Sequence, residues 1–442
     1  MLGGILVVLA YLAAFAGDGL LAYFTPDDMM NLYFAWFRPL TDADRPIGAV
    51  FYRAMFAAFG LNPLPYRIAC FVLLLVNLAL LYRLCVRLSG SREIGALACL
   101  LGVYHAHLSD LYYSTGTVYD LLCCAFFLGA FVYYAEIRQR AELPGWRQML
   151  VFLGLYGYAL GAKEMAVTLP VLLLLYDALY HPAERAGVWI RRETRILAVP
   201  LLVTAAFIGW KIAGPGGVLN NPDYRPHLTW HALVEAWRHY AFDLFYGTVT
   251  FSAWRVVLLW AVMLGIAFAA RRRALLFGFG FVFVGILPVA FIPPRGFFAI
   301  YLTLPGWYLF GATALVAGRD LLARRRTATL FVVVAVALFP LHWHQKPLGN
   351  RWVAGTHESV RNVVERIPDV VGRLPRRARV LFLSDPYPKD EWMLTFIFRL
   401  HYRDDGIQVD RVRAMRECPD AVAQAAYDHT FRLDGAGLTL VR

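Results

Sequence analysis

Long apolar runs separated by short polar segments fill the first 345 residues of the chain. A membrane-spanning helix needs about 20 predominantly apolar residues. The pattern predicts about eleven spans, several of them short: residues 2–24, 64–84, 93–109, 118–136, 147–162, 165–180, 196–212, 252–270, 274–292, 298–317 and 327–341. We therefore expect an all-α polytopic membrane protein over residues 1–345.

The pattern changes after Trp343, and residues 346–442 are polar. The segments RARVLFLSD and GIQVDRVRAM are typical of strands, Glu391 to Tyr402 is typical of a helix, and the final LTLVR is a possible third strand. The tail thus predicts a small α/β domain outside the membrane. It contains no glycine-rich phosphate loop, metal-ligand spacing or catalytic-triad pattern, so we assign it no chemistry.

Two loops between predicted spans carry amphipathic stretches. The first, residues 25–63, has apolar side chains at helical spacing, and so does the longer loop 213–251. These side chains are Leu32, Tyr33, Trp36, Phe37, Phe51, Met55, Phe56 and Phe59 in the first loop, and Trp230, Leu233, Trp237 and Tyr240 in the second. Such stripes indicate helices that lie in the membrane interface or pack on the bundle of spans.

Composition and charge agree with the hydrophobic pattern. The chain has 442 residues, of which 59% are hydrophobic and 17% charged, with a formal net charge of +12, whereas soluble domains carry about 25% charged residues. Every second loop between the predicted spans is rich in arginine. These five loops hold seventeen arginines and six acids: residues 83–93, 136–147, 184–195, 271–273 and 319–326. By the positive-inside rule these loops are cytoplasmic. The N-terminus is then inside and the C-terminus outside, and nucleic acid is not needed to explain the charge.

The stretch FTPDDMMN places Asp27 and Asp28 directly after the first span, where carboxylates are costly. One interpretation is a helix start, in which Pro26 ends the preceding helix and Asp27 caps the next one. The other is a catalytic base or a metal ligand that faces a lipid-linked substrate. Asp18, which we expect to be buried in the first span, has no evident role beyond hydrogen bonding.

Three further groups lie in predicted outer loops. His107 and Asp110 share a helical face and, with Asp28, form a possible divalent-cation site; alternatively His107 is a hydrogen-bonded interfacial histidine. Lys163 and Glu164 are adjacent, which suits either a local ion pair or a lysine that binds phosphate. Arg295 is the only charge in IPPRGFFAIY and suits either an interfacial anchor or a phosphate ligand.

These segments together resemble the GT-C superfamily of membrane glycosyltransferases, especially bacterial relatives of the protein O-mannosyltransferases, including those with tetratricopeptide repeats. The resemblance covers about residues 20–310 in five motifs. They are the acidic pair, the stretch from Arg45 to Arg67, HAHLSDLYYSTGTVYD with His105, Asp110 and Asp120, AKEMAVTLPVLLLLYD from Ala162 to Asp177, and Arg295 with Tyr301 and Pro305.

The chain departs from the family pattern in three places. The arginine before the last loop aspartate is Val118 or Tyr119 here, and Phe297 and Phe298 stand where tyrosines are usual. The tail after Pro347 is not a tetratricopeptide array. Selection of the acceptor by repeats of that kind is therefore not expected.

The resemblance implies transfer of a sugar from a polyprenyl phosphate to an acceptor on the outer face of the bacterial cytoplasmic membrane. An acceptor hydroxyl needs a carboxylate base, and the leaving phosphate needs a cation. We predict Asp28 as the base, with Asp27 as the alternate, and Asp110 as a group that orients the acceptor or shares a metal, Mg or Mn, with Asp28 and His107. The other predicted substrate-binding residues are Lys163 and Arg295 for the phosphate, Glu164 to position Lys163, and Arg45, Asp120 and Tyr301.

Two rival functions use similar features. A lipid-linked-sugar transporter or flippase also carries charges within the membrane, but the polar residues cluster at the outer face and no half of the chain repeats a broken helix. An oligosaccharide ligase or polymerase would also have a long outer loop. The acidic pair after the first span favours the GT-C interpretation.

Overall fold

The computed structural model describes residues 2–140, 142–183, 185–214, 224–248, 251–322, 327–415, 424–434 and 437–442. Parts of four predicted loops, residues 141, 184, 215–223, 249–250 and 323–326, lie outside the described residues. The chain forms two compact units. The first unit contains Met1–Asp18, Cys70–Tyr112 and Thr117–Gly349, and the second contains Gly19–Ala69, Tyr113–Gly116 and Asn350–Arg442.

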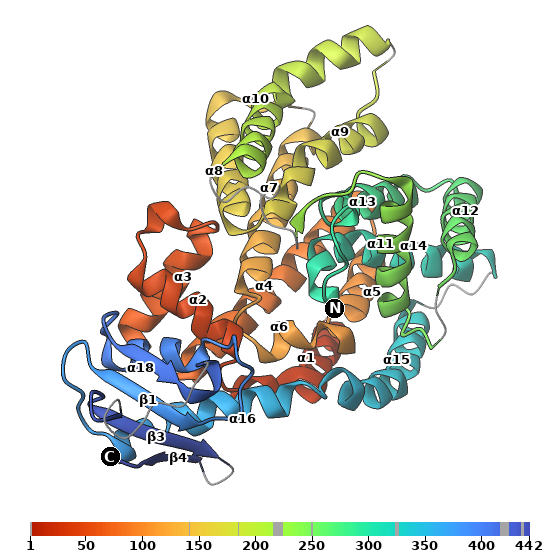
Figure 1. The fold of residues 1–442 in the computed structure, drawn as a ribbon. Helices are drawn as coiled ribbons and strands as arrows, with labels where there is room; N and C mark the ends of the chain where they lie inside the picture. The colour runs from red at the N-terminus through yellow and green to blue at the C-terminus, as the bar shows by residue number, and fades with distance from the viewer. Residues whose placement is uncertain are drawn as a thin grey trace. The chain divides into compact units, whose positions relative to one another are not determined.

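The first unit is helical (Figure 1). Its α-helices are α1 (Leu2–Ala16), most of α4 (Pro63–Ser89), α5 (Arg92–Gly102), α6 (Ser109–Tyr113), α7 (Val118–Gln139), α8 (Trp146–Ala162), α9 (Leu169–Tyr180), α10 (Ala186–Ala213), α11 (Trp230–Leu244), α12 (Ala253–Ala270), α13 (Arg273–Ala290), α14 (Leu304–Leu321) and α15 (Thr327–Gly349). Short 3-10 turns η3 (Ala106–Leu108), η4 (Glu164–Thr168) and η7 (Phe297–Thr303) connect some of them.

Seven of the described helices or helix pairs are long and apolar enough to cross a membrane. An eighth span is possible if α5 and Ala106–Tyr113, which meet at an angle of 66°, are counted together. The chain is therefore a multi-pass membrane protein. Helices occupy all eleven predicted segments, but α8 has 17 residues and α9 has 12, so these two are shorter than a full crossing.

The second unit begins with helices that the sequence predicts for the first outer loop. These are α2 (Pro26–Phe37) and α3 (Pro46–Phe59), with the short turns η1 (Gly17–Leu21) at the junction between the units and η2 (Leu40–Asp42) between the two helices. Helix α3 ends at Gly60, whose φ of 55° lies in the left-handed region that favours glycine. The first residues of α4 complete this part of the unit.

The polar tail supplies the rest of the second unit. Helices α16 (Val353–Val364) and α17 (Ile367–Val370) precede a four-stranded sheet of order β2-β1-β3-β4. The strands are β1 (Arg379–Ser384), β2 (Gln408–Arg411), β3 (His429–Asp434) and β4 (Gly437–Leu440), and α18 (Met393–Tyr402) connects β1 to β2; the turn η8 (Val412–Ala414) follows β2. Strand β1 is parallel to β2 and β3, and β4 is antiparallel to β3.

Aromatic contacts hold the parts of the second unit together. Phe382 of β1, Phe398 of α18 and Phe431 of β3 meet with ring centroids 5.5–5.6 Å apart, which forms the core of the α/β fold. Tyr33 of α2 lies 4.8 Å from Phe396 of α18. The α/β fold of the tail is thus packed directly on the helix that carries the acidic pair.

The predicted strands in RARVLFLSD, GIQVDRVRAM and LTLVR are present as β1, β2 and β4, and the predicted helix is α18. Strand β3 was not predicted. The sequence pattern predicts a domain boundary between residues 345 and 346, whereas the second unit also includes residues 19–69 and 113–116. Packing between distant segments, which no local pattern records, produces this grouping.

Candidate functional site

The acidic pair lies in the first turn of α2. Thr25 is the N-cap, and Pro26 occupies the first helical position, where a missing backbone N–H costs nothing. The Thr25 N–H donates to Asp28 Oδ2 at 2.8 Å, and the Asp28 N–H donates to Thr25 Oγ1 at 3.3 Å. Residues 25 to 28 therefore form a reciprocal capping box. The sequence interpretation of Asp27 as the cap is wrong, because Thr25 and Asp28 share that role.

Asp28 is completely buried, and both of its carboxylate oxygens accept hydrogen bonds. Ser114 Oγ donates to Asp28 Oδ1 at 2.9 Å, while Oδ2 accepts from Thr25. Burial raises the pKa of Asp28, and the hydrogen bonds from Thr25, Ser114 and the Thr115 backbone, together with the positive charge of Arg67, oppose that rise. The carboxylate is thus fully engaged with its own surroundings.

The surroundings of Asp28 come from three separate segments of the second unit. Arg67 is fully buried; its Nε donates to the Gly19 carbonyl at 3.1 Å and its Nη1 to Thr115 Oγ1 at 3.4 Å. A Cβ at Gly116 would lie 3.1 Å from Ser114 Oγ and 3.3 Å from Asp28 Oδ1, so a side chain there would crowd both. Sequence reasoning missed Arg67, Ser114 and Gly116, since nothing local to them points to Asp28.

Asp27 has a different environment although it is the preceding residue. Its side chain is exposed. The protein around it partly excludes water, which raises the pKa of Asp27, and the negative charge of Glu391 raises it further. An exposed carboxylate with a raised pKa can accept a proton from a ligand, whereas Asp28 offers no open oxygen.

The first unit holds a second set of predicted residues. Lys163 Nζ forms an ion pair with Asp120, and both side chains are buried. The Lys163 ammonium also lies 5.4 Å from the ring centroid of Phe298 in η7. The structure therefore brings together Asp120 and Lys163, which come from two different family-like motifs. Glu164, predicted to position Lys163, is the first residue of η4, and its role stays a prediction.

Arg295 lies just before η7 and is surrounded by residues of α11 and the turn before it. Its guanidinium carbon is 4.0 Å from the ring centroid of Tyr224. Its backbone N–H donates to Tyr240 Oη at 3.3 Å, and its carbonyl oxygen is 2.9 Å from His239 Nε2. These contacts fix the backbone of Arg295 and place its charge over an aromatic face.

Asp243 of α11 lies between two imidazoles. Its Oδ1 is 3.5 Å from His107 Nδ1 and its Oδ2 is 3.6 Å from His239 Nε2. Burial raises the pKa of Asp243, while the two histidines oppose that effect. Sequence reasoning missed this residue, although its spacing of four from His239 on an amphipathic helix is a usable signal.

The predicted metal ligands are Asp28, His107 and Asp110. No three His, Cys, Asp or Glu side chains among the described residues are arranged so that they could hold a metal. Asp28 and His107 instead have the partners named above, and the Asp110 carbonyl accepts from Thr117 Oγ1 at 3.2 Å. A requirement for Mg or Mn stays a prediction, and no step below depends on one.

The remaining predicted residues are placed as follows. Tyr301 lies in η7, where its hydroxyl is 3.4 Å from Asn77 Nδ2. Arg45 directly precedes α3. Asp18 was expected to be buried, but its side chain is 54% exposed and pairs with Lys346 at 2.9 Å. The first α-helix ends at Ala16, which leaves Asp18 in a turn that can reach a lysine of α15.

No family model matches the chain, and no curated protein matches it in sequence. The structure of ArnT from Cupriavidus metallidurans bound to undecaprenyl phosphate is similar with a TM-score of 0.56 and 13% identity, covering 92% of this chain and 86% of ArnT. The apo structure of the same protein gives a TM-score of 0.54 and 13% identity over 97% and 92%. The chain therefore shares the fold of ArnT, which agrees with the GT-C-like fold predicted from the sequence. The closer relation to O-mannosyltransferases stays a prediction.

Proposed function

We propose that this GT-C chain is a membrane glycosyltransferase that moves a sugar from a polyprenyl-phosphate donor to an acceptor. The reaction would take place at the outer face of the bacterial cytoplasmic membrane, with the N-terminus inside and the C-terminus outside. Two findings support this proposal: the apolar helices, and the fold shared with ArnT, whose structure is described with undecaprenyl phosphate bound. The arginine-rich loops support the orientation.

The observation that carries the proposal is the difference in burial between Asp27 and Asp28. Asp28 is buried and both its oxygens accept hydrogen bonds, so it fixes the start of α2. Asp27 is exposed on the same turn. We therefore assign the base to Asp27, whereas the sequence alone favours Asp28. A raised pKa makes Asp27 a stronger proton acceptor near neutral pH than an ordinary aspartate.

The chemistry requires one bond to form and one to break. The acceptor oxygen attacks the anomeric carbon, the bond between that carbon and the phosphate oxygen breaks, and the acceptor proton passes to Asp27. Polyprenyl phosphate leaves with an added negative charge, which a cation stabilises. The resemblance to GT-C enzymes assigns this task to Arg295, with its fork of donors, and to Lys163, which pairs with Asp120.

A test of this function uses membranes that contain the chain and a polyprenyl-phosphate hexose or pentose labelled in the sugar. A transferase moves label from the lipid to an acceptor or, more slowly, to water, and leaves unlabelled polyprenyl phosphate. A transporter or flippase returns the labelled lipid intact. Recovery of only intact donor, with membranes lacking the chain as control, would contradict the proposal.

A further inference from the structure

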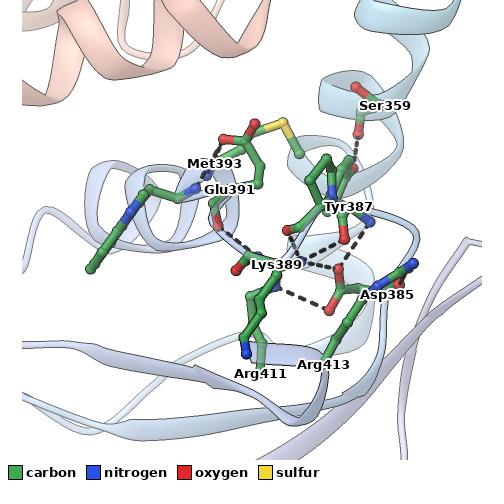
Figure 2. Close-up of polar contacts among 10 residues, drawn as sticks. Ser359, Asp385, Tyr387, Lys389, Glu391, Met393, Arg411 and Arg413 are labelled. Carbon is green, nitrogen blue, oxygen red and sulfur yellow. Dashed lines mark hydrogen bonds and ion pairs between the residues drawn. The ribbon is translucent and has the colours of Figure 1, made fainter. Parts of the chain in front are cut away.

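A loop of the α/β fold is fixed by an unusually well-bonded arginine. Arg411 of β2 is buried and forms an ion pair with the fully buried carboxylate of Asp385. Its guanidinium also donates to the carbonyl oxygens of Tyr387 at 3.0 Å, Pro388 at 2.9 Å and Glu391 at 2.6 Å. Figure 2 shows Arg411 reaching across the loop to Asp385 and to the backbone near Lys389 and Glu391. We call residues 385–392 the Arg411 loop.

This loop leads directly into the helix that packs on α2. Glu391 Oε1 accepts from the backbone N–H of Trp392 at 2.9 Å and of Met393 at 3.0 Å, so the carboxylate satisfies donors at the start of α18. Helix α18 then contacts α2 through Phe396, which lies 4.8 Å from Tyr33 and 5.8 Å from Phe34. The loop and the acidic pair thus belong to one packed body.

A second contact region holds the same two helices in register. The Tyr33 hydroxyl donates to Asp405 Oδ1 at 2.6 Å, and Arg399 Nη1 donates to the Tyr33 hydroxyl at 2.7 Å. Further along both helices, the Arg403 guanidinium carbon lies 5.5 Å from the ring centroid of Trp36, so α2 and α18 run in the same direction. The Arg411 loop at the start of α18 therefore lies at the same end of this helix pair as Asp27 in the first turn of α2.

The surface of the loop has the chemistry of a carbohydrate-binding site. Trp392 is 64% exposed although indole is the largest apolar side chain, and a rigid loop holds it in that position. The C–H face of a pyranose packs on an aromatic face, and its hydroxyls donate to carboxylates, which Glu391 and the adjacent Asp390 supply. Arg411 occupies the carbonyl oxygens of Tyr387, Pro388 and Glu391, so these groups are less available to pair with the backbone of a polypeptide acceptor.

We propose that the Arg411 loop is the acceptor-binding wall beside Asp27, and that Trp392 is the platform on which a carbohydrate acceptor packs. The proposal rests on the function proposed above, and it gives the α/β fold a role in acceptor choice. The acceptor is then an envelope glycan or a glycolipid sugar, both of which present the same pyranose chemistry. Arg411 acts through the loop and is a positioning residue.

The test follows labelled sugar from the polyprenyl-phosphate donor into two products, an acceptor and free sugar released by water. The acceptor probe is the oligosaccharide fraction of the host envelope, with a Ser/Thr-rich synthetic peptide as comparator. Trp392→Ala should raise the apparent KM for the oligosaccharides about tenfold, with unchanged kcat at saturation and unchanged release of free sugar. Trp392→Phe should recover most of the loss. Trp146→Ala, at a site that is 70% exposed in α8, is the matched control and should change nothing.

The outcomes separate the two proposals. The acceptor wall is supported if the wild type places label in both products and only Trp392→Ala changes the KM for the oligosaccharides. Normal oligosaccharide KM in Trp392→Ala, or transfer to the peptide and not to the oligosaccharides, overturns it while the transferase function stands. If the wild type leaves the labelled donor intact, the transferase function is overturned, and the acceptor wall with it.

Discussion

Two buried charges, one in each unit, are held in different ways. In the second unit, hydroxyl and backbone N–H groups donate to the buried Asp28 carboxylate, and the charge of Arg67 also acts on it. In the first unit, the buried Lys163 ammonium forms an ion pair with the Asp120 carboxylate. A group held by neutral donors can be replaced by a neutral side chain of the same shape at modest cost, whereas removal of one member of a buried ion pair leaves its partner uncompensated. The two sites should therefore respond differently to substitution.

The largest expected effect is on the buried pair of the first unit. Lys163→Met should lower the free energy of unfolding by about 3–5 kcal/mol, because the buried Asp120 carboxylate loses the cation of its ion pair. Thermal unfolding in detergent is the measurement. The double variant Lys163→Met/Asp120→Leu is the control, and it should recover most of the loss. A single variant as stable as the wild type would show that the pair does not hold the helices together.

Arg295 differs from Lys163, because its guanidinium carbon lies 4.0 Å from the ring centroid of Tyr224 and its charge is placed over an aromatic face. Arg295→Met should therefore weaken donor use and leave stability nearly unchanged. Loss of a charge-assisted hydrogen bond is worth about 1.5–3 kcal/mol, or about 10- to 150-fold in donor KM. Transfer rates at varied donor concentration measure this. Unchanged KM together with a lower melting temperature would make Arg295 a structural residue.

Gly116 tests how closely the second unit packs around Asp28. Gly116→Ala places a Cβ 3.1 Å from Ser114 Oγ and 3.3 Å from Asp28 Oδ1, so the neighbours must shift by a few tenths of an ångström. We expect a loss of about 1 kcal/mol in unfolding free energy. Gly129→Ala, where the new Cβ meets nothing within 4 Å, is the matched control in α7. Equal stability of both variants would mean that the site around Asp28 is loosely packed.

The smallest expected effect is a shift in the pKa of Asp27. Water exclusion and then the Glu391 charge raise the pKa of Asp27, so part of its base form is lost on acidification at a pH where an ordinary aspartate is still ionised. Glu391→Gln removes the second cause and should lower the pKa of Asp27. The acidic limb of the pH–rate profile should therefore move to lower pH. A limb that stays in place, or moves to higher pH, would mean that Glu391 does not act on the base.

Much of this architecture can be predicted from local patterns. Apolar runs locate the helices, the stripes in loop 25–63 predict α2 and α3, and short apolar segments in the polar tail predict three of the four strands. Strand β3 is missed because three of the six residues in HTFRLD are charged or titratable, although the strand is as long as β1. The eleven predicted spans exceed the seven or eight long apolar helices. An apolar run as short as α9 does not reach across a bilayer, and α15, although it has 23 residues, is not among the seven.

The site is only partly predictable. The residue types at Asp27, Asp28, Lys163 and Arg295 are visible in the sequence, but the choice between the two aspartates depends on burial. Thr25-Pro-Asp-Asp has the spacing of a capping box, a signal that could have assigned Asp28 to the helix start. Ser114 and Arg67 reach Asp28 only through the tertiary fold. The pairing of Asp243 with two histidines has the same origin.

Asp27→Asn and Asp28→Asn, compared at equal protein levels in membranes, test the central claim most directly. Removal of a general base costs about 100- to 10,000-fold in rate, so Asp27→Asn should lose at least two orders of magnitude in sugar transfer with little change in donor binding. Asp28→Asn can still accept from the Thr25 N–H and donate to Ser114, so it should keep most of its turnover and lose about 1 kcal/mol of stability. A large loss of turnover in Asp28→Asn, with near-normal transfer by Asp27→Asn, would contradict this account.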